Sequence, residues 1–412
     1  MTFPTIHINL VSAQLSANLI PTLSDPCIEG VVLVTGDDKM VNSERRLIDI
    51  YKRKGVEILG ITFQCGHTSY YPKIKNSANR LLDILLTKYP EHRIILNATG
   101  GTKMMSQAFC DAFRHSDNVE VIYLDTASGW IVYPYQPERS CQVESVIDIE
   151  TYLLAHNFRM TGGSINDADT LQLIVDRRHH TEFLAKTLTN AQTIMAAVNW
   201  FANSALNNQA VPLTAKINDY LYSKQLLFIE QLEKRGVLTR DGRKVTFINE
   251  DAARYLCGGW MEELAYLAAV DAGADFVGIN VEGKWLKAGS INSTNSKNEL
   301  DLLIVHNNQM MLVECKTQRF RYKEKDNLSE QDKMKAQKGK EISNKLDSLG
   351  KNVAGLYSKV IFVSAGDVSH TMADRMKAYN ITCFEGKNIF KFKDYVESWM
   401  ESTKPDAALP DV

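Results

Sequence analysis

The stretch at residues 298–317, NELDLLIVHNNQMMLVECKT, most constrains the fold of this chain because it places charges within an otherwise apolar strand pair. Asn307 and Asn308 divide the stretch, and asparagine tolerates the left-handed backbone that a two-residue hairpin turn needs. If these two residues form the turn, His306 pairs with Gln309 and the register of the whole hairpin follows.

That register places Asp301 directly opposite Glu314. Side chains alternate along a strand, so both carboxylates share one face, and Lys316 lies two residues beyond Glu314. The repulsion between opposed carboxylates is relieved if a divalent cation, Mg²⁺ or Mn²⁺, binds between them through oxygen ligands. The simpler alternative is a solvated hairpin with ordinary surface charges. The remaining members of this face are apolar: Leu303, Val305, Met310 and Leu312.

The residues E-L-D at 299–301 and E-C-K at 314–316 resemble the PD-(D/E)xK nuclease motif. In that family the acidic pair binds the metal, and the lysine positions or activates the attacking water. The resemblance implies that Asp301 and Glu314 are metal ligands and catalytic residues, and that Lys316 is catalytic.

Composition sets broad limits on the chain. Its 412 residues predict more than one domain, since domains usually span about 100–200 residues. The net charge of −2 gives no overall basic signal, so nucleic-acid binding would need a local patch. No apolar run approaches the ~20 residues of a membrane span and no signal-peptide pattern opens the chain, so a cytoplasmic location is expected. The seven cysteines are scattered without a CxxC pair, which favours reduced thiols.

Between residues 6 and about 149, apolar strands alternate with amphipathic helices. This pattern predicts an α/β fold with a parallel, doubly wound, Rossmann-like sheet, whose ligands bind beyond the carboxyl ends of the strands. Helices are expected at 41–53 and 74–88, and strands at 6–11, 30–34, 56–61, 93–96 and 119–125.

The sequence NATGGTK at 97–103 follows one of these strands and precedes an expected helix. Gly100 and Gly101 let the backbone approach a ligand closely. The first N–H groups of the helix, the Thr102 hydroxyl and the Lys103 ammonium all favour an anion. The loop matches neither GxGxxG nor the P-loop, and the alternative is a glycine turn that only connects strand to helix.

NATGGTK after a strand, in a Rossmann-like domain joined to a C-terminal PD-(D/E)xK domain, resembles the CARF (CRISPR-associated Rossmann fold) nucleases of type III CRISPR systems over almost the whole chain. In that family the CARF domain dimerises and a cyclic oligoadenylate lies across the two-fold axis. The resemblance therefore implies a homodimer and this ligand, and a ring of phosphates suits two symmetry-related anion-binding loops. By motif match the ligand contacts are Asn97, Thr99, Gly100, Gly101, Thr102 and Lys103, with Ser12 and Gln14 in the loop after the first strand.

Other residues near this pocket have simpler interpretations. Asp37, Asp38 and Asp125 could contact ribose or adenine, but they could equally cap helices and turns, and capping is preferred for Asp37 and Asp38. Trp130 and Tyr133 could stack on adenine, yet their alternation along a strand favours packing.

The chain divides into a predicted CARF domain at 1–155, a connector at 156–255 and a nuclease domain at 256–412. The connector contains a helix followed by a hairpin around residues 241–242, which resembles a winged-helix module. Binding of DNA and transmission of dimer motion are both open for this module. Its basic cluster is modest and comprises Lys234, Arg235, Arg240, Arg243 and Lys244.

A helix expected at 261–271 opens the nuclease domain, and restriction-like folds take a first acidic residue from this helix. Glu262 and Glu263 are the candidates, and neighbours on a helix point about 100° apart, so only one can face the site. Glu263 is preferred as the metal ligand. Further on, residues 319–351 carry ten basic and six acidic side chains, which fits a solvated segment as well as a contact with the substrate backbone.

These features predict a metal-dependent endonuclease acting on single-stranded DNA, RNA or both, with nicking of duplex DNA as a further option. The resemblance implies activation by cyclic oligoadenylate, with cyclic tetra-adenylate as the expected ring. The alternative is a ligand-sensing transcription regulator in which the winged-helix module binds DNA and the nuclease-like domain is inactive.

Overall fold

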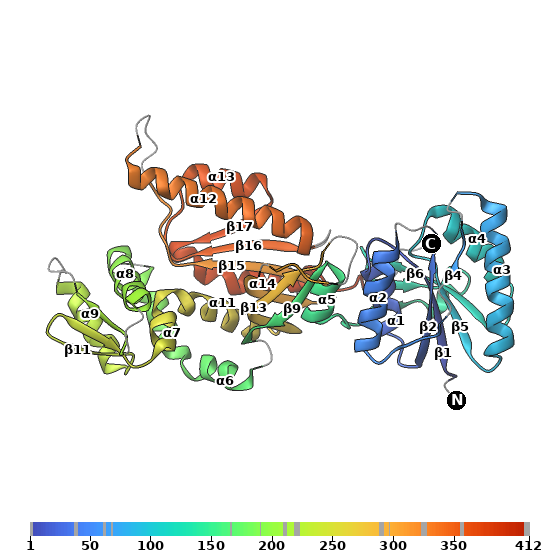
Figure 1. The fold of residues 1–412 in the computed structure, drawn as a ribbon, viewed down its shortest axis with the longest axis horizontal. Helices are drawn as coiled ribbons and strands as arrows, with labels where there is room; N and C mark the ends of the chain where they lie inside the picture. Colours follow the sequence, from blue (N-terminus) through green and yellow to red (C-terminus); the bar gives the residue numbers. More distant parts are fainter. Residues whose placement is uncertain are drawn as a thin grey trace.

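The computed structural model describes residues 3–36, 40–60, 63–66, 69–164, 167–189, 191–208, 212–217, 223–287, 292–295, 297–322, 328–354 and 358–407. Three units lie side by side along the long axis of the molecule (Figure 1). The N-terminal unit forms one end, the middle segment of the chain forms the other end, and the C-terminal unit lies between them. The predicted α/β class is confirmed.

The N-terminal unit is built on an eight-stranded sheet of order β3-β2-β1-β5-β6-β7-β8, with β4 also paired to β2. Strands β1 to β6 run parallel, and β7 and β8 are antiparallel additions. The chain order reverses between β1 and β5. In doubly wound sheets, ligands bind outside the carboxyl ends of the strands at such a point. The strands are β1 (Thr5–Leu10), β2 (Ile28–Thr35), β3 (Glu57–Ile58), β4 (Phe63–Gln64), β5 (Arg93–Asn97), β6 (Val119–Asp125), β7 (Trp130–Val132) and β8 (Cys141–Gln142).

Helices cover both faces of this sheet, as expected for a doubly wound fold. One face packs against α1 (Ser16–Leu23) and α2 (Val41–Arg53), and the other packs against α3 (Tyr71–Lys88) and α4 (Lys103–Phe113). Because both faces are covered, β1 is buried along its entire length.

The middle segment forms a helical unit with a three-stranded sheet of order β10-β12-β11. The succession of helix, strand, helix and hairpin agrees with the predicted winged-helix arrangement. Within the hairpin Asp241 pairs with Lys244, so the two-residue turn is Gly242-Arg243. The elements are α6 (Ala168–Asp176), α7 (Arg178–Leu188), α8 (Gln192–Asn208), β10 (Thr214–Lys216), α9 (Ser223–Lys234), β11 (Leu238–Asp241), β12 (Lys244–Phe247) and α10 (Glu250–Arg254).

The C-terminal unit is built on a six-stranded sheet of order β17-β16-β15-β14-β13-β9. Its edge strand β9 (Phe158–Gly162) comes from the segment assigned to the connector, and it pairs with the long strand β13 (Phe276–Trp285). The other strands are β14 (Asn298–His306), β15 (Gln309–Lys316), β16 (Lys359–Ser364) and β17 (Ile381–Glu385). The helices are α5 (Ile149–Ala155), α11 (Trp260–Asp271), α12 (Glu330–Leu349), α13 (His370–Ala378) and α14 (Phe392–Ser402).

Alternate residues of β14 and β15 face opposite sides of the sheet, as their sequence pattern predicts. Leu303 and Leu312 pack in the core beneath α12 and α13, whereas Leu302 and Val313 pack with α11 and α14. Figure 1 shows α12 and α13 together on one side of the sheet. The charge-rich segment therefore contributes an ordered helix, α12, capped by the Ser329 side chain.

The C-terminal tail, described as far as residue 407, contacts the N-terminal unit. The Asp406 N–H donates to the Ser128 carbonyl at 2.9 Å, and its own carbonyl accepts from the Trp130 indole at 2.9 Å. A second contact between the two units forms at the β14–β15 turn. The Asn308 side-chain oxygen accepts hydrogen bonds from the N–H groups of Val146 and Ile147 at 2.9 and 3.0 Å. Two separate segments of the C-terminal unit are thus joined to the N-terminal unit by hydrogen bonds.

Candidate active site and ligand loops

The β14–β15 hairpin has the predicted turn and register. Asn307 and Asn308 adopt φ values of +48° and +61°, and His306 pairs with Gln309. Positive φ at both central positions is the condition for a tight hairpin turn that matches strand twist. The continuous pairing from this turn fixes which side chains arrive at the far end of the hairpin.

At that far end, Asp301, Glu314 and Lys316 converge. The Lys316 ammonium lies 3.0 Å from Asp301 Oδ2 and 2.8 Å from Glu314 Oε1. The strand pairing stops one residue earlier, and the Asp301 carboxylate instead accepts the Cys315 N–H at 2.8 Å. Both carboxylates are buried, with exposures of 8% for Asp301 and 2% for Glu314. The solvated-hairpin alternative is therefore wrong for these side chains.

A further lysine, which the sequence interpretation missed, completes the surroundings of Glu314. Lys345 of α12 donates to both carboxylate oxygens of Glu314, at 3.0 and 2.9 Å. The signal was present in the helical pattern, because Ile342 and Leu346 mark the buried face of α12 and Lys345 borders it.

The electrostatic environment distinguishes the two carboxyl groups. Burial and the neighbouring Glu314 raise the pKa of Asp301. Burial would also raise the pKa of Glu314, but Lys316 and Lys345 lower it overall. Although burial opposes a charge on Lys316, Asp301 and Glu314 raise its pKa above the usual lysine range. Lys316 is therefore an ammonium at neutral pH, able to orient water and offset negative charge but without a lone pair to accept a proton.

The helix α11 directs its two adjacent glutamates to different surroundings. Burial raises the pKa of Glu262 to about 8, and the Asp301 carboxylate adds to this effect. Glu263 instead forms an ion pair with Arg177, with one contact at 2.8 Å, and accepts from the Thr181 hydroxyl at 3.4 Å. The Glu263 carboxylate, which was preferred as the metal ligand, is thus occupied by an arginine from the middle unit, whereas Glu262 is the glutamate that interacts with Asp301 and is free of this ion pair.

The oxygen donors of this site suit a hard divalent cation. Among the described residues, no three His, Cys, Asp or Glu side chains converge as a ready metal cluster. Burial and Asp301 nevertheless keep Glu262 largely protonated at neutral pH, and a nearby divalent cation would favour its ionised form. Asp301, Glu314 and Glu262 are thus the residues that would hold Mg²⁺ or Mn²⁺.

The predicted ligand loop lies where the chain order of the N-terminal sheet reverses. A Cβ atom on Gly100 would lie 1.9 Å from the Leu10 carbonyl oxygen, and Gly101 has a φ of +72°, so both positions need glycine. Thr102 caps α4 by accepting the Met105 N–H at 3.2 Å. The loop therefore presents a capped helix N-terminus, at which Thr102 and Lys103 are exposed.

Two residues predicted to contact the ligand form hydrogen bonds within the protein. Asn97 is fully buried, and its side chain bonds Asn9 at 2.9 Å and the Ala17 carbonyl at 2.8 Å. Thr99 accepts the Leu124 N–H at 2.7 Å. Asn97 thus acts as a support beneath the loop rather than as a surface that a ligand reaches.

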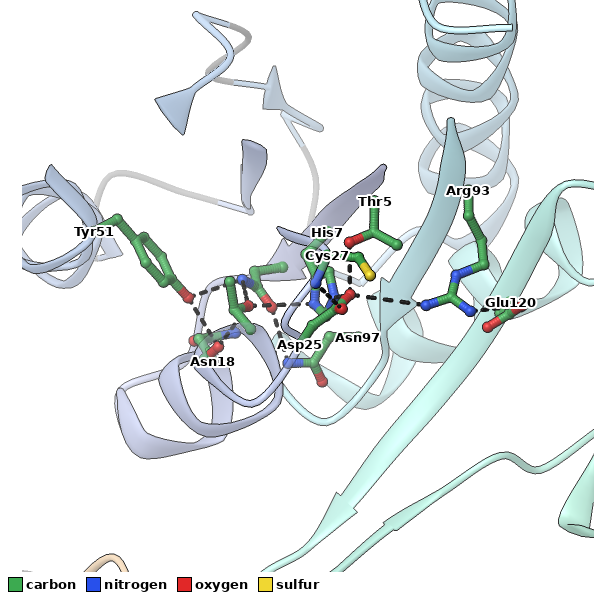
Figure 2. Close-up of polar contacts among 11 residues, drawn as sticks. Thr5, His7, Asn18, Asp25, Cys27, Tyr51, Arg93, Asn97 and Glu120 are labelled. Atoms are coloured by element: carbon green, nitrogen blue, oxygen red, sulfur yellow. Dashed lines mark hydrogen bonds and ion pairs between the residues drawn. The ribbon is translucent and has the colours of Figure 1, made fainter. Parts of the chain in front are cut away.

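A buried polar network leads from Asn97 through Asn9 and Tyr51 to Asn18, and Figure 2 shows Asn97, Tyr51 and Asn18 within it. The Asn18 side chain donates to the Leu10 carbonyl at 2.8 Å and accepts the Ser12 N–H at 3.1 Å. Tyr51 donates to the Asn18 carbonyl at 2.8 Å. Ser12 is partly exposed and Gln14 is exposed, so their side chains remain candidates for ligand contact.

The secondary candidates near the pocket have local roles. Asp125 accepts from Ala127 N at 3.0 Å and from the Ser128 hydroxyl at 2.8 Å, as a turn-forming aspartate does. Trp130 binds the C-terminal tail, which agrees with the packing interpretation. Asp37 and Asp38 lie outside the described residues.

Sequence comparison gives two family matches that coincide with the terminal units. The Card1 CARF domain matches residues 6–152, and the Card1-like endonuclease domain matches residues 249–403. The chain is a member of the CARF nucleases. No curated protein matches it in sequence.

Solved structures share the fold of this CARF nuclease over nearly its full length. Protein VC1899 from Vibrio cholerae covers 97% of this chain and 99% of its own, at 20% identity and a TM-score of 0.79. Can2 from Sulfobacillus thermosulfidooxidans, solved in complex with cyclic tetra-adenylate, covers 96% and 99% at 23% identity and a TM-score of 0.68. In the described part of this CARF nuclease, no helix is long and apolar enough to cross a membrane.

Proposed function

We propose that this protein is a metal-dependent endonuclease that hydrolyses phosphodiester bonds in single-stranded DNA, RNA or both, and that cyclic oligoadenylate activates it in type III CRISPR defence. The observation that carries the proposal is the convergence of buried Asp301 and Glu314 with Lys316, in a domain that matches a Card1-like endonuclease. Can2, which shares the fold, binds cyclic tetra-adenylate, and this supports the same class of activator here.

The residues of the candidate active site have separate roles in the proposed hydrolysis. Asp301, Glu314 and Glu262 would hold the divalent cation, which when bound would lower the pKa of water in the site and offset charge on the phosphate. Lys316, held as an ammonium by the two carboxylates, orients the attacking water and stabilises charge that develops on the phosphate oxygens. Lys345 fixes the position of Glu314 from α12.

Activation begins at the exposed loops of the CARF domain. Lys103 and the N-terminus of α4 bind phosphate groups, and Ser12 and Gln14 contact the ring from the neighbouring strand end. We propose that two chains form a homodimer around the ring, with each chain contributing one copy of these loops. The ligand activates cleavage to the extent that it binds the active arrangement more tightly than the resting one.

The decisive experiment incubates the purified protein with plasmid, single-stranded DNA and RNA in Mg²⁺ or Mn²⁺, with cyclic oligoadenylates of several ring sizes. Cleavage that depends on both metal and ring is expected. Absence of cleavage in every combination would refute the nuclease, whereas equal cleavage with and without the ring would refute the activation.

Two substitutions separate the sites. Glu314→Ala is expected to abolish cleavage and leave cyclic tetra-adenylate binding intact. Lys103→Ala is expected to weaken binding of the ring, while Lys333→Ala, an exposed lysine on α12 paired with Glu330, serves as the control. Loss of ring binding in Glu314→Ala with normal binding in Lys103→Ala would overturn both site assignments.

A further inference from the structure

A cleft opens directly beside the candidate active site, between the middle unit and the nuclease domain. It has a volume of about 660 Å³, and its walls come from α8, the end of β15 and α12. Lys316 lines it, so the cleft is continuous with the catalytic residues. The side chains that matter below are Asn199, Trp200, Thr317, Lys335 and Lys338.

The α8 wall is fixed to the catalytic strand. The Asn199 amide donates to the Thr317 hydroxyl at 3.1 Å, and that hydroxyl donates to the Cys257 carbonyl at 3.3 Å. Thr317 directly follows Lys316 in sequence. The middle unit therefore contributes a wall whose position is tied to the active site, which sequence analysis did not indicate.

Trp200 follows Asn199 on this wall and is 52% exposed. A tryptophan ring that remains this open beside a cleft offers a flat stacking surface. Unpaired nucleobases stack on exposed aromatic rings with little dependence on sequence. Bases within a duplex are stacked on each other and do not offer a free face.

The opposite wall carries a line of positive charge. Lys335, Lys338 and Lys345 occupy positions i, i+3 and i+10 of α12, within one third of the helix circumference. Lys345 contacts Glu314, and the rise of the helix places Lys335 about 15 Å further along the axis. The line therefore leads from the candidate metal ligands to the cleft.

We propose that this cleft binds the nucleic-acid strand on one side of the scissile phosphate, with one unpaired base stacked on Trp200 and backbone phosphates against Lys335 and Lys338. The inference rests on the proposed nuclease function and adds a positioning residue to it. It also gives the winged-helix unit a role at the active site through α8 rather than through its hairpin.

The test measures cleavage and binding of a single-stranded oligonucleotide by the full chain, with Mn²⁺ and cyclic tetra-adenylate for cleavage and without metal for binding. Trp200→Ala is expected to raise KM and the dissociation constant roughly tenfold, with little change in kcat. Trp200→Phe should restore most of the loss, because a smaller ring still stacks. Leu227→Ala, which removes an equally exposed apolar side chain from α9, is the control.

Two further readouts identify what Trp200 and Lys338 contact. A set of substrates carries a single abasic site at successive positions along the strand. The KM values of the wild type and Trp200→Ala should become equal when the abasic site is at one position, at a fixed distance from the cut, because the base that stacks on Trp200 is then missing. Lys338→Met should flatten the dependence of log KM on log salt concentration by about 0.7, the value for one lost phosphate contact on a single strand, whereas Lys333→Met should not.

The outcomes separate this inference from the proposed function. Unchanged binding and KM in Trp200→Ala overturn the subsite even if cleavage is normal. Weakened binding in Trp200→Ala, in a protein that never cleaves, supports the subsite and refutes the nuclease. A change of oligomeric state in Trp200→Ala, seen by sedimentation, overturns the subsite in favour of a contact between copies.

Discussion

Replacing Glu262 by glutamine is expected to stabilise the metal-free protein while abolishing cleavage. Burial and Asp301 raise the pKa of Glu262 to about 8, from an ordinary value near 4.5. A carboxyl group whose pKa is higher in the folded state loses stabilising free energy as pH rises from its unfolded pKa to its folded pKa. At pH 7 the solution is about 2.5 pH units above the unfolded pKa, so the wild type has lost roughly 3 kcal/mol of unfolding free energy.

The measurement is urea unfolding of the wild type and Glu262→Gln in EDTA from pH 4 to pH 8. The two curves should be similar near pH 4 and separate progressively toward pH 8, with the variant more stable. Mn²⁺ should then stabilise the wild type more than the variant, because the ion favours the ionised carboxylate.

Glu263→Gln at the adjacent position is the matched control, and its stability should change in the opposite direction. Glu263 is buried and paired with Arg177, so its loss leaves a partly buried guanidinium with Asp251 as its remaining acidic partner among the described residues. Breaking a buried pair costs about 3–5 kcal/mol, and the remaining partner reduces this to about 2 kcal/mol. If Glu263→Gln abolishes cleavage without destabilising the fold, and Glu262→Gln remains active, the assignment of the two glutamates is refuted.

Three further predictions concern the CARF domain and its attachment. Asp25→Asn should lower the free energy of unfolding by about 2 kcal/mol at pH 7. Burial alone would raise the pKa of Asp25, but hydrogen bonds, including the one with His7, hold that pKa at about 2. The difference in unfolding free energy from the wild type should therefore vanish as pH falls from 4 to 2. Gly100→Ala should abolish binding of cyclic tetra-adenylate in a calorimetric titration, since its Cβ would meet the Leu10 carbonyl at 1.9 Å, and normal affinity would contradict the loop geometry. Asn308→Ala leaves two backbone N–H groups without their acceptor, so chemical unfolding should show a loss of about 2–4 kcal/mol, and a neutral result would show that this tie does not hold the units together.

The hairpin was predictable from sequence because its determinants are local. Two adjacent asparagines set the turn, the period-two pattern sets the faces, and together they bring Asp301 and Glu314 to one end. The parallel sheet was predictable for the same reason, since its strands and helices alternate with clear periodicity. The two glycines at 100–101 were also recognisable as part of a ligand loop, because adjacent glycines allow the backbone to come close to another group.

Only the tertiary structure decided which glutamate of α11 faces the site, because both faces of this helix are buried and neighbouring residues have equal local preferences. The choice depends on Arg177, which is distant in sequence and occupies Glu263. The same holds for Lys345 and Trp200, whose significance comes from the placement of α12 and α8 beside β15. Sequence by itself therefore determined the elements and the charged hairpin of this protein, whereas contacts between distant segments, which no local pattern encodes, decided how its candidate active site is completed.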